Sequence, residues 1–114
     1  MKVRFALIMS GDKPVGIWAS DGEWFDHFYV PGREDLFDFF SVAFNDIDVP
    51  KMMKKKDFWE YWTTQFPYGV TIEGPFDMVT DFDQVDDFGA AAVDDLDKMV
   101  NLVKGKNLQP AYIA

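Results

Sequence analysis

Cysteine is missing from all 114 residues of this sequence. Disulfide bonds, thiolate catalysis and cysteine-type zinc sites are therefore excluded together. The sequence also lacks an apolar run long enough to span a bilayer, and it shows no basic segment followed by an apolar one that would indicate a signal peptide. We therefore expect a protein that works in the cytoplasm.

Lysine and arginine are absent from residues 57–97, a block of 41 residues that carries eleven Asp or Glu. The rest of the chain has nine acids and eleven bases, so the net charge of −9 is concentrated in this block. Segregated charge creates a field that a partner can recognise. Phosphate backbones bind clusters of Lys and Arg, so this sign argues against nucleic acid as a ligand. It favours a cation or a basic nucleic-acid-binding protein or complex.

Histidine occurs once, as His27, so the chain has no second imidazole for a metal site or a catalytic relay. Glycine-rich phosphate loops and a Ser-His-Asp order are also missing. Carboxylate pairs among Glu23, Asp26 and Glu34 are the one basis for a small enzyme, and an acidic chain supplies such pairs by chance. Residues 81–87 offer oxygen ligands for a cation but lack the glycine and final Glu of an EF-hand loop. We expect a non-enzyme with no cofactor and no metal.

Alternating apolar residues predict strands over 2–9, 15–20 and 23–30, with turns at 10–14 and at Asp21-Gly22. The third strand has apolar residues on both faces, so we expect part of it to be covered twice. A further strand is predicted over 68–73. Gly74-Pro75 is then interpreted as a turn, with 76–79 extending the sheet.

Helical spacing predicts helices over 34–47 and 57–66, and one from about 80 to 104 that Gly105 ends. Pro50 and Pro67 are read as the stops of the first two helices. The predicted fold is α+β: a small, mainly antiparallel sheet of three to five strands, with two or three helices on one face and a long, acidic last helix. Residues 1–106 are expected to form one domain, with 107–114 as a loosely attached tail.

The outer face of the last predicted helix is the main candidate for a binding site. Acids four residues apart, such as Asp83 and Asp87, repel each other and do not help a helix. A solvated face with acids near a helix N-terminus accounts for Asp81 to Asp87, but not for the acids further along. The predicted contact residues are Asp81, Asp83, Asp86, Asp87, Asp94, Asp95 and Asp97, and a second group is Asp57, Glu60, Glu73 and Asp77.

Helix 57–66 has five aromatic residues in ten, which suits core packing or an apolar interface anchor such as Trp59. In the second interpretation the protein is an interaction module anchored by residues 58–66, without charge mimicry. The lysines between 51 and 56 form a solvated loop, or fold against the acidic block of the same molecule or a neighbour. A homodimer is therefore left open.

Two motifs resemble those of the ArdA-type antirestriction proteins. Gly22-Glu-Trp24-Phe-Asp26, with a helix opening at Asp35-Leu36, is similar to the first unit of that family, in which a G-x-W strand leads to an acidic helix. Glu73-Gly-Pro75-Phe76 is similar to the family's E-x-P-F turn, and an amphipathic acidic helix follows it in both. The resemblance covers about Val15 to Val103 through short motifs with gaps between them.

ArdA-type proteins imitate the charge of bent duplex DNA and occupy the DNA channel of type I restriction–modification enzymes. The resemblance therefore implies a DNA mimic encoded by a phage or mobile element. Together with the charge pattern, it predicts an inhibitor that blocks the nucleic-acid-binding surface of a host defence enzyme, such as a restriction–modification or CRISPR complex, in the host cytoplasm. Such a protein would bind no nucleic acid directly and would not interact with membranes.

Overall fold

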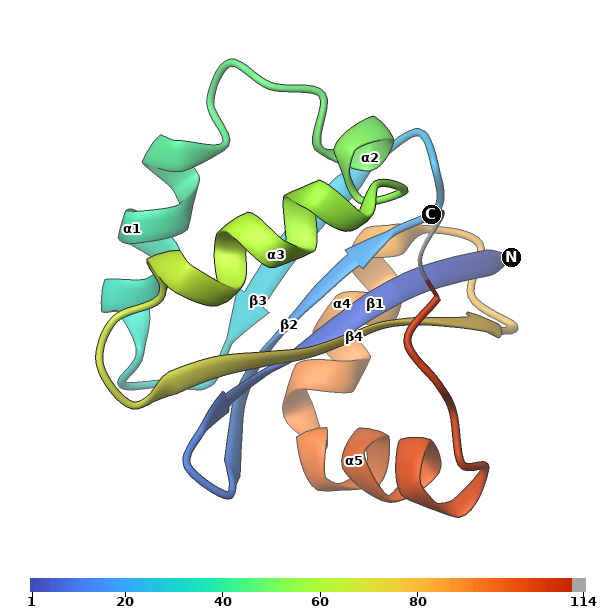
Figure 1. Ribbon diagram of the computed structural model, residues 1–114. Coiled ribbons are helices and arrows are strands. Elements are labelled where there is room, and N and C mark those ends of the chain that lie inside the picture. Colours follow the sequence, from blue (N-terminus) through green and yellow to red (C-terminus); the bar gives the residue numbers. More distant parts are fainter. Residues whose placement is uncertain (112–114) are drawn as a thin grey trace.

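A four-stranded antiparallel sheet lies at the centre of the computed structural model, which describes residues 1–111 (Figure 1). Its strands are β1 (Lys2–Ser10), β2 (Lys13–Ser20), β3 (Phe25–Tyr29) and β4 (Val70–Val79), in the spatial order β3-β2-β1-β4. Each neighbouring pair is antiparallel. The predicted α+β fold with a small antiparallel sheet is confirmed.

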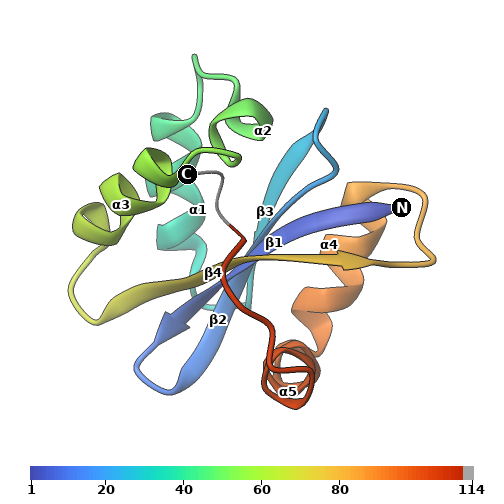
Figure 2. The same ribbon diagram turned by 45° about the vertical axis from the view of Figure 1, so that its right-hand side comes forward.

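The helices of the described chain cover both faces of this sheet (Figure 2). α1 (Glu34–Ala43), α2 (Val49–Met52) and α3 (Lys56–Gln65) lie on one face, and α4 (Val85–Asp94) and α5 (Leu96–Gly105) lie on the other. Five helices in residues 1–111 are more than the two or three predicted. The central strands require both layers because they are apolar on both faces. In β1, Ala6 and Ile8 face α1–α3, whereas Phe5 and Leu7 face α4 and α5.

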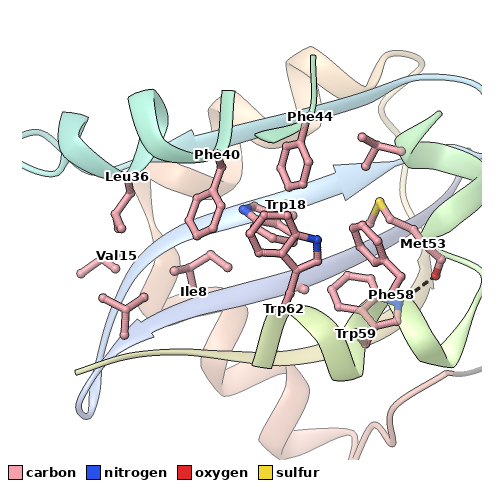
Figure 3. Packing of buried hydrophobic residues seen from close by; sticks show 13 residues of the cluster. Ile8, Val15, Trp18, Leu36, Phe40, Phe44, Met53, Phe58, Trp59 and Trp62 are labelled. Carbon is pink, nitrogen blue, oxygen red and sulfur yellow. Dashed lines mark hydrogen bonds between the residues drawn. The ribbon is translucent and has the colours of Figure 1, made fainter. Parts of the chain in front are cut away.

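The core on the α1–α3 side is aromatic and is built around Trp18 of β2 (Figure 3). The Trp18 ring is fully buried and makes edge-on contacts with Phe40 and Phe44 of the α1 region, at centroid distances of 5.0 and 5.1 Å. Trp59 Nε1 donates a hydrogen bond to the Met53 carbonyl oxygen at 2.9 Å, which ties α3 to the turn after α2. These contacts hold three short helices against one face of the sheet.

The core on the other side joins the sheet to α4 and α5. Phe5 of β1 contacts Phe76 of β4 and Phe88 of α4, with ring centroids 5.6 and 6.2 Å apart. Gly89 lies directly over Phe28 of β3, and a Cβ at this position would lie 2.0 Å from the Phe28 ring. Glycine therefore allows α4 to pack closely on β3. As predicted, β3 is covered on both faces, since its alternate residues join the two cores.

The last predicted helix is two helices with a break at Asp95. The Asp95 backbone is non-helical (φ −146°, ψ 66°), and its side chain accepts a hydrogen bond from Lys98 N at 3.3 Å, as a helix N-cap does. The prediction of one long helix from about residue 80 is wrong, because α4 begins at Val85 and Asp95 starts a second helix. The predicted apolar face is confirmed by burial of Val85, Phe88, Ala92, Leu96 and Met99.

Gly74 and Pro75 lie inside β4 and do not turn the chain. Their peptide bond is cis, and the pairing of β1 with β4 shifts register between Phe5 and Leu7 at this point. Gly74 has φ +129°, and a Cβ there would lie 3.2 Å from Ala6 Cα, so glycine suits this close approach. The predicted turn is therefore wrong, and the two predicted strands are one strand with an irregularity.

The predicted helix over 34–47 is also shorter than expected. α1 ends at Ala43, and α2 forms a separate short helix in which Asp48 Oδ1 accepts a hydrogen bond from Lys51 N at 3.3 Å. Pro50 lies in the first turn of α2, where proline is favoured, so it helps to begin a helix rather than end one. The predicted lysine loop spans α2, a turn and the start of α3, and its lysines are exposed.

The chain after α5 returns to β4, an edge strand of the sheet. Leu108 N donates a hydrogen bond to Val103 O at 3.0 Å, and Ala111 N donates one to Pro75 O at 2.7 Å. These bonds attach residues 107–111 to α5 and β4, and the last three residues of the predicted tail, 112–114, lie outside the described residues. None of the helices formed by residues 1–111 has both the length and the apolar character needed to span a bilayer.

Candidate acidic interface

The first set of predicted contact residues lies along the α4–α5 layer, on the opposite side of the sheet from α3. Two of them are in the loop before α4, two are in its first turn, and three surround the junction with α5. All seven are exposed. We call this set the acidic face; it consists of Asp81, Asp83, Asp86, Asp87, Asp94, Asp95 and Asp97.

The buried side of α4 determines which acids point to solvent. Val85, Phe88 and Ala92 are packed against the sheet, which leaves Asp87 and Asp94 on the outer side of the helix. Seven residues of α-helix separate these two, so their Cα atoms are about 10 Å apart along the axis. The apolar phase of α4, which was evident in the sequence, therefore fixes the outward direction of Asp87 and Asp94.

No side chain of the acidic face forms an ion pair within residues 1–111. The ion pairs in this part of the chain are Arg4–Asp77, Arg33–Asp35 and Lys56–Glu60, and none includes a residue between 81 and 97. The Met1 ammonium group, which donates to Thr80 O and Phe82 O, and Lys98 lie beside the set, but seven exposed carboxylates outnumber them and give a negative potential that attracts a basic surface. Its role as a contact surface stays a prediction.

Asp95 differs from the other members because it also has a structural role. Its carboxylate accepts the hydrogen bond from Lys98 N that begins α5. Replacing an N-cap aspartate by alanine costs about 1 kcal/mol of stability, so Asp95 cannot be changed without affecting the fold. A test of the acidic face should leave Asp95 in place.

Asp26 of β3 adds another carboxyl group beside the acidic face. Its side chain shares a hydrogen bond with Asp86, and a pocket of about 400 Å³, also lined by Trp24 and Gln84, opens next to the pair. Burial raises the pKa of Asp26, the hydrogen bond and charge of Asp86 raise it further, and a hydrogen bond from His27 N opposes them. Sequence reasoning paired Asp26 with Glu23 or Glu34, because nothing local indicates that α4 crosses β3 at this point.

The second group of predicted contact residues does not join the acidic face. Asp57 and Glu60 are on α3, in the opposite helical layer, and Lys56 Nζ lies 3.7 Å from Glu60 Oε1. Asp77 of β4 accepts two hydrogen bonds from the Arg4 guanidinium, at 2.8 and 2.9 Å. Glu73 is exposed on β4. The structure thus separates the eleven predicted residues into the acidic face and a dispersed remainder.

The aromatic helix α3 does not present an apolar anchor. Phe58, Trp59 and Trp62 are at most 5% exposed and belong to the core around Trp18. The interpretation of Trp59 as an exposed anchor is wrong, and the predicted role in core packing is confirmed. Tyr61, at 57% exposed, is the large aromatic residue of this helix that reaches solvent.

His27 belongs to a buried polar network. Its Nδ1 lies 2.9 Å from the Tyr29 hydroxyl oxygen, which also accepts a hydrogen bond from Trp18 Nε1 at 3.0 Å. The imidazole stacks on Phe37, with the planes 7° apart. Burial lowers the pKa of His27 to about 4 and raises that of Tyr29. At neutral pH the ring is therefore uncharged, so Tyr29 can donate to Nδ1.

Across residues 1–111 no group of three His, Asp or Glu side chains is placed to hold a metal ion. The Asp26–Asp86 pair supplies only two carboxyl groups.

No family model, curated protein or solved structure matches this chain. The resemblance to ArdA-type proteins stays a prediction. The residues that carry it lie at the β2–β3 turn, at the start of α1 and inside β4.

Proposed function

We propose that this protein is an acidic inhibitor that occupies the nucleic-acid-binding surface of a basic protein or complex in the cytoplasm. Its carboxylates would take the places of phosphate groups. The observation that carries the proposal is the acidic face: seven exposed aspartates within residues 81–97, none of them in an ion pair. A restriction–modification or CRISPR complex is the class of target that this charge and the ArdA resemblance favour.

The acidic face carries fewer negative charges per ångström than DNA does, but the two values are of a similar order of magnitude. Duplex DNA carries one negative charge for about every 1.7 Å of its axis. The ten residues of α4 extend about 15 Å, and four of the seven acids lie on this helix or immediately after it. Asp94, Asp95 and Asp97 then follow one another around the junction with α5, where charge is most concentrated.

A second candidate function is an interaction module that binds through apolar contacts. Burial of α3 removes its predicted anchor, but α1 has exposed apolar side chains that could replace it. Phe37 and Phe39 are 46% and 44% exposed, and Val42 is 80% exposed. In that case, high salt would leave binding nearly unchanged, because apolar contacts are not screened.

The experiment that separates these functions measures binding to a purified type I restriction–modification enzyme and to a purified CRISPR complex, with duplex DNA as competitor. The test variant replaces Asp83, Asp87 and Asp94 by Asn, which removes three charges from the acidic face. We expect binding about 3- to 100-fold weaker, at roughly 0.2–1 kcal/mol per surface charge, and a smaller loss in high salt.

A matched control removes the same number of charges elsewhere. Asp12, Asp38 and Asp46 are exposed and lie outside the acidic block, and none takes part in an ion pair of the described chain. Their replacement by Asn should leave binding nearly unchanged. Equal losses in both triple variants would show that only net charge matters. A further variant, Val42→Asp, adds a charge to the exposed apolar surface of α1. If only this variant lost binding, the interaction module would be favoured. Direct binding of random duplex DNA at physiological salt would contradict mimicry.

A further inference from the structure

A cavity of about 570 Å³ opens at one end of the sheet, beside α2. The start of β1, the ends of β2 and β4, and the turn after α2 line it. It is larger than the pocket beside Asp26, and it lies within the 300–1,000 Å³ range typical of small-molecule sites. The cavity lies between this end of the sheet and the α2 region of the helical layer.

The charge of this cavity is opposite to that of the protein as a whole. Lys2, Arg4 and Lys54 line it, in a chain with a net charge of −9. Two carboxylates also line it, so the three cations leave a net charge of +1 in the lining. Asp77 binds Arg4, and Asp21 Oδ1 accepts hydrogen bonds from Glu23 N and Trp24 N, at 2.9 and 2.8 Å, within its own turn.

The two lysines of the cavity carry the charge that remains available. Within residues 1–111 neither Lys2 nor Lys54 lies within 4 Å of a carboxylate oxygen. Arg4 is held in place from both sides, since its Nη1 also donates to the Met53 carbonyl oxygen at 3.1 Å. Arg4 therefore forms part of the wall, whereas the two ammonium groups can pair with an anion.

The rest of the lining is largely apolar. Met53 is 1% exposed, and Val79 is 73% exposed although it is an aliphatic residue on a strand. Pro50 completes this apolar part, whereas the Met78 side chain packs against the core on the other face of the sheet. An apolar lining with a few charged groups at fixed positions is the usual composition of a small-molecule site.

We propose that this cavity binds a small carboxylate with an apolar body, of the type of a medium-chain fatty acid. The carboxylate pairs with Lys2 and Lys54, and the apolar body lies against Pro50, Met53 and Val79. The site has the opposite charge from the acidic face and different residues, so it is independent of the proposed inhibitor function.

The test is a titration of the ¹⁵N-labelled full chain with octanoate, followed by amide chemical shifts, with octanol as the uncharged match. We expect saturable shifts at Arg4, Ser20 and Met53, and much weaker effects of octanol. Lys2→Gln and Lys54→Gln should each weaken octanoate binding about 1.5- to 5-fold. Lys104→Gln, on α5 and away from the cavity, should leave it unchanged.

A second pair of variants tests the cavity without removing a lysine. Val79→Glu adds a negative charge at the mouth, and Val79→Gln is the matched neutral change; the exposure of Val79 means that both should fold. Octanoate should bind more weakly to Val79→Glu than to Val79→Gln. Three results would overturn the proposal: no saturable shift at these amides up to about 10 mM ligand, equal binding of octanol, or shifts that depend on protein concentration alone. The last result would instead show that a second copy of the chain associates at the cavity.

Discussion

Asp26 and Asp86 bring two carboxyl groups together across the contact between β3 and α4. Asp26 lies in the edge strand β3, and Asp86 lies in the first turn of α4. The two residues are 60 positions apart in the chain. Because burial and the neighbouring acid both raise the pKa of Asp26, ionising this pair at neutral pH opposes folding.

Asp26→Asn should therefore stabilise the protein at pH 7. Asparagine removes one charge, its oxygen can still accept the hydrogen bond from His27 N, and its amide can donate to Asp86. We expect a gain of about 1 kcal/mol, or roughly 4 °C in melting temperature. Asp12→Asn, an exposed change outside the pair, is the control. The gain should disappear at acidic pH, where Asp26 in the original chain is protonated; an equal effect at every pH would contradict the assignment.

His27 should make the protein less stable as pH falls. Its pKa is about 4 in the folded state and about 6.5 when unfolded, so the unfolded chain takes up a proton first. The stability is complete above pH 6.5 and is lost as pH decreases from there towards 4. Between pH 7 and pH 5 we expect a loss on the order of 1 kcal/mol, allowing for solvent at the ring edge.

Melts of the original chain and of His27→Asn at several pH values measure this effect. Asparagine has an acceptor near the position of Nδ1 but does not titrate. The variant should lose most of the pH dependence in this range. Asp26 acts in the opposite direction, because its raised pKa increases stability as pH falls, so the comparison is best made in an Asp26→Asn background. Parallel profiles would show that another group is responsible.

Leu96→Asp should unfold the protein or weaken it by several kcal/mol. Leu96 is 5% exposed, in the core beneath α5, and a charge there would be buried without a partner. Asp94→Asn, two residues away on the solvent side, should leave the melting temperature unchanged or slightly higher. If Leu96→Asp melted normally, the phase of α5 and the position of the acidic face would both be wrong.

Gly89→Ala should destabilise the protein by about 1–3 kcal/mol, because the added methyl group would overlap the Phe28 ring. Gly105→Ala is the matched control, since a Cβ at Gly105 meets no other atom within 4 Å. At that position alanine should be neutral or stabilising by up to about 1 kcal/mol. Urea unfolding of both variants gives the comparison, and an equal effect would contradict the close packing of α4 on β3.

Local patterns predicted the elements whose stability depends on their own sequence. The predicted bounds of β1, β2 and α3 lie within a few residues of the observed bounds. Their alternation or helical spacing is continuous, and their turns contain Gly, Asp or Pro. The apolar phase through Val85, Phe88 and Leu96 was also predictable, and with it the outward direction of Asp87 and Asp94. Neither the fold class nor the acidic face required long-range information.

Tertiary structure decided the features for which local preferences are nearly balanced. An aspartate at position 95 can either continue a helix or cap a new one. In the structure Asp95 caps α5, and Leu96 and Met99 of that helix pack against the sheet. Gly74-Pro75 is typical of a turn, yet pairing with β1 keeps it within a strand. The burial of Trp59, the meeting of Asp26 with Asp86 and the basic cavity all depend on which helical layer covers which face of the sheet. No pattern within one segment determines that choice, since it is made by contacts between residues far apart in the chain.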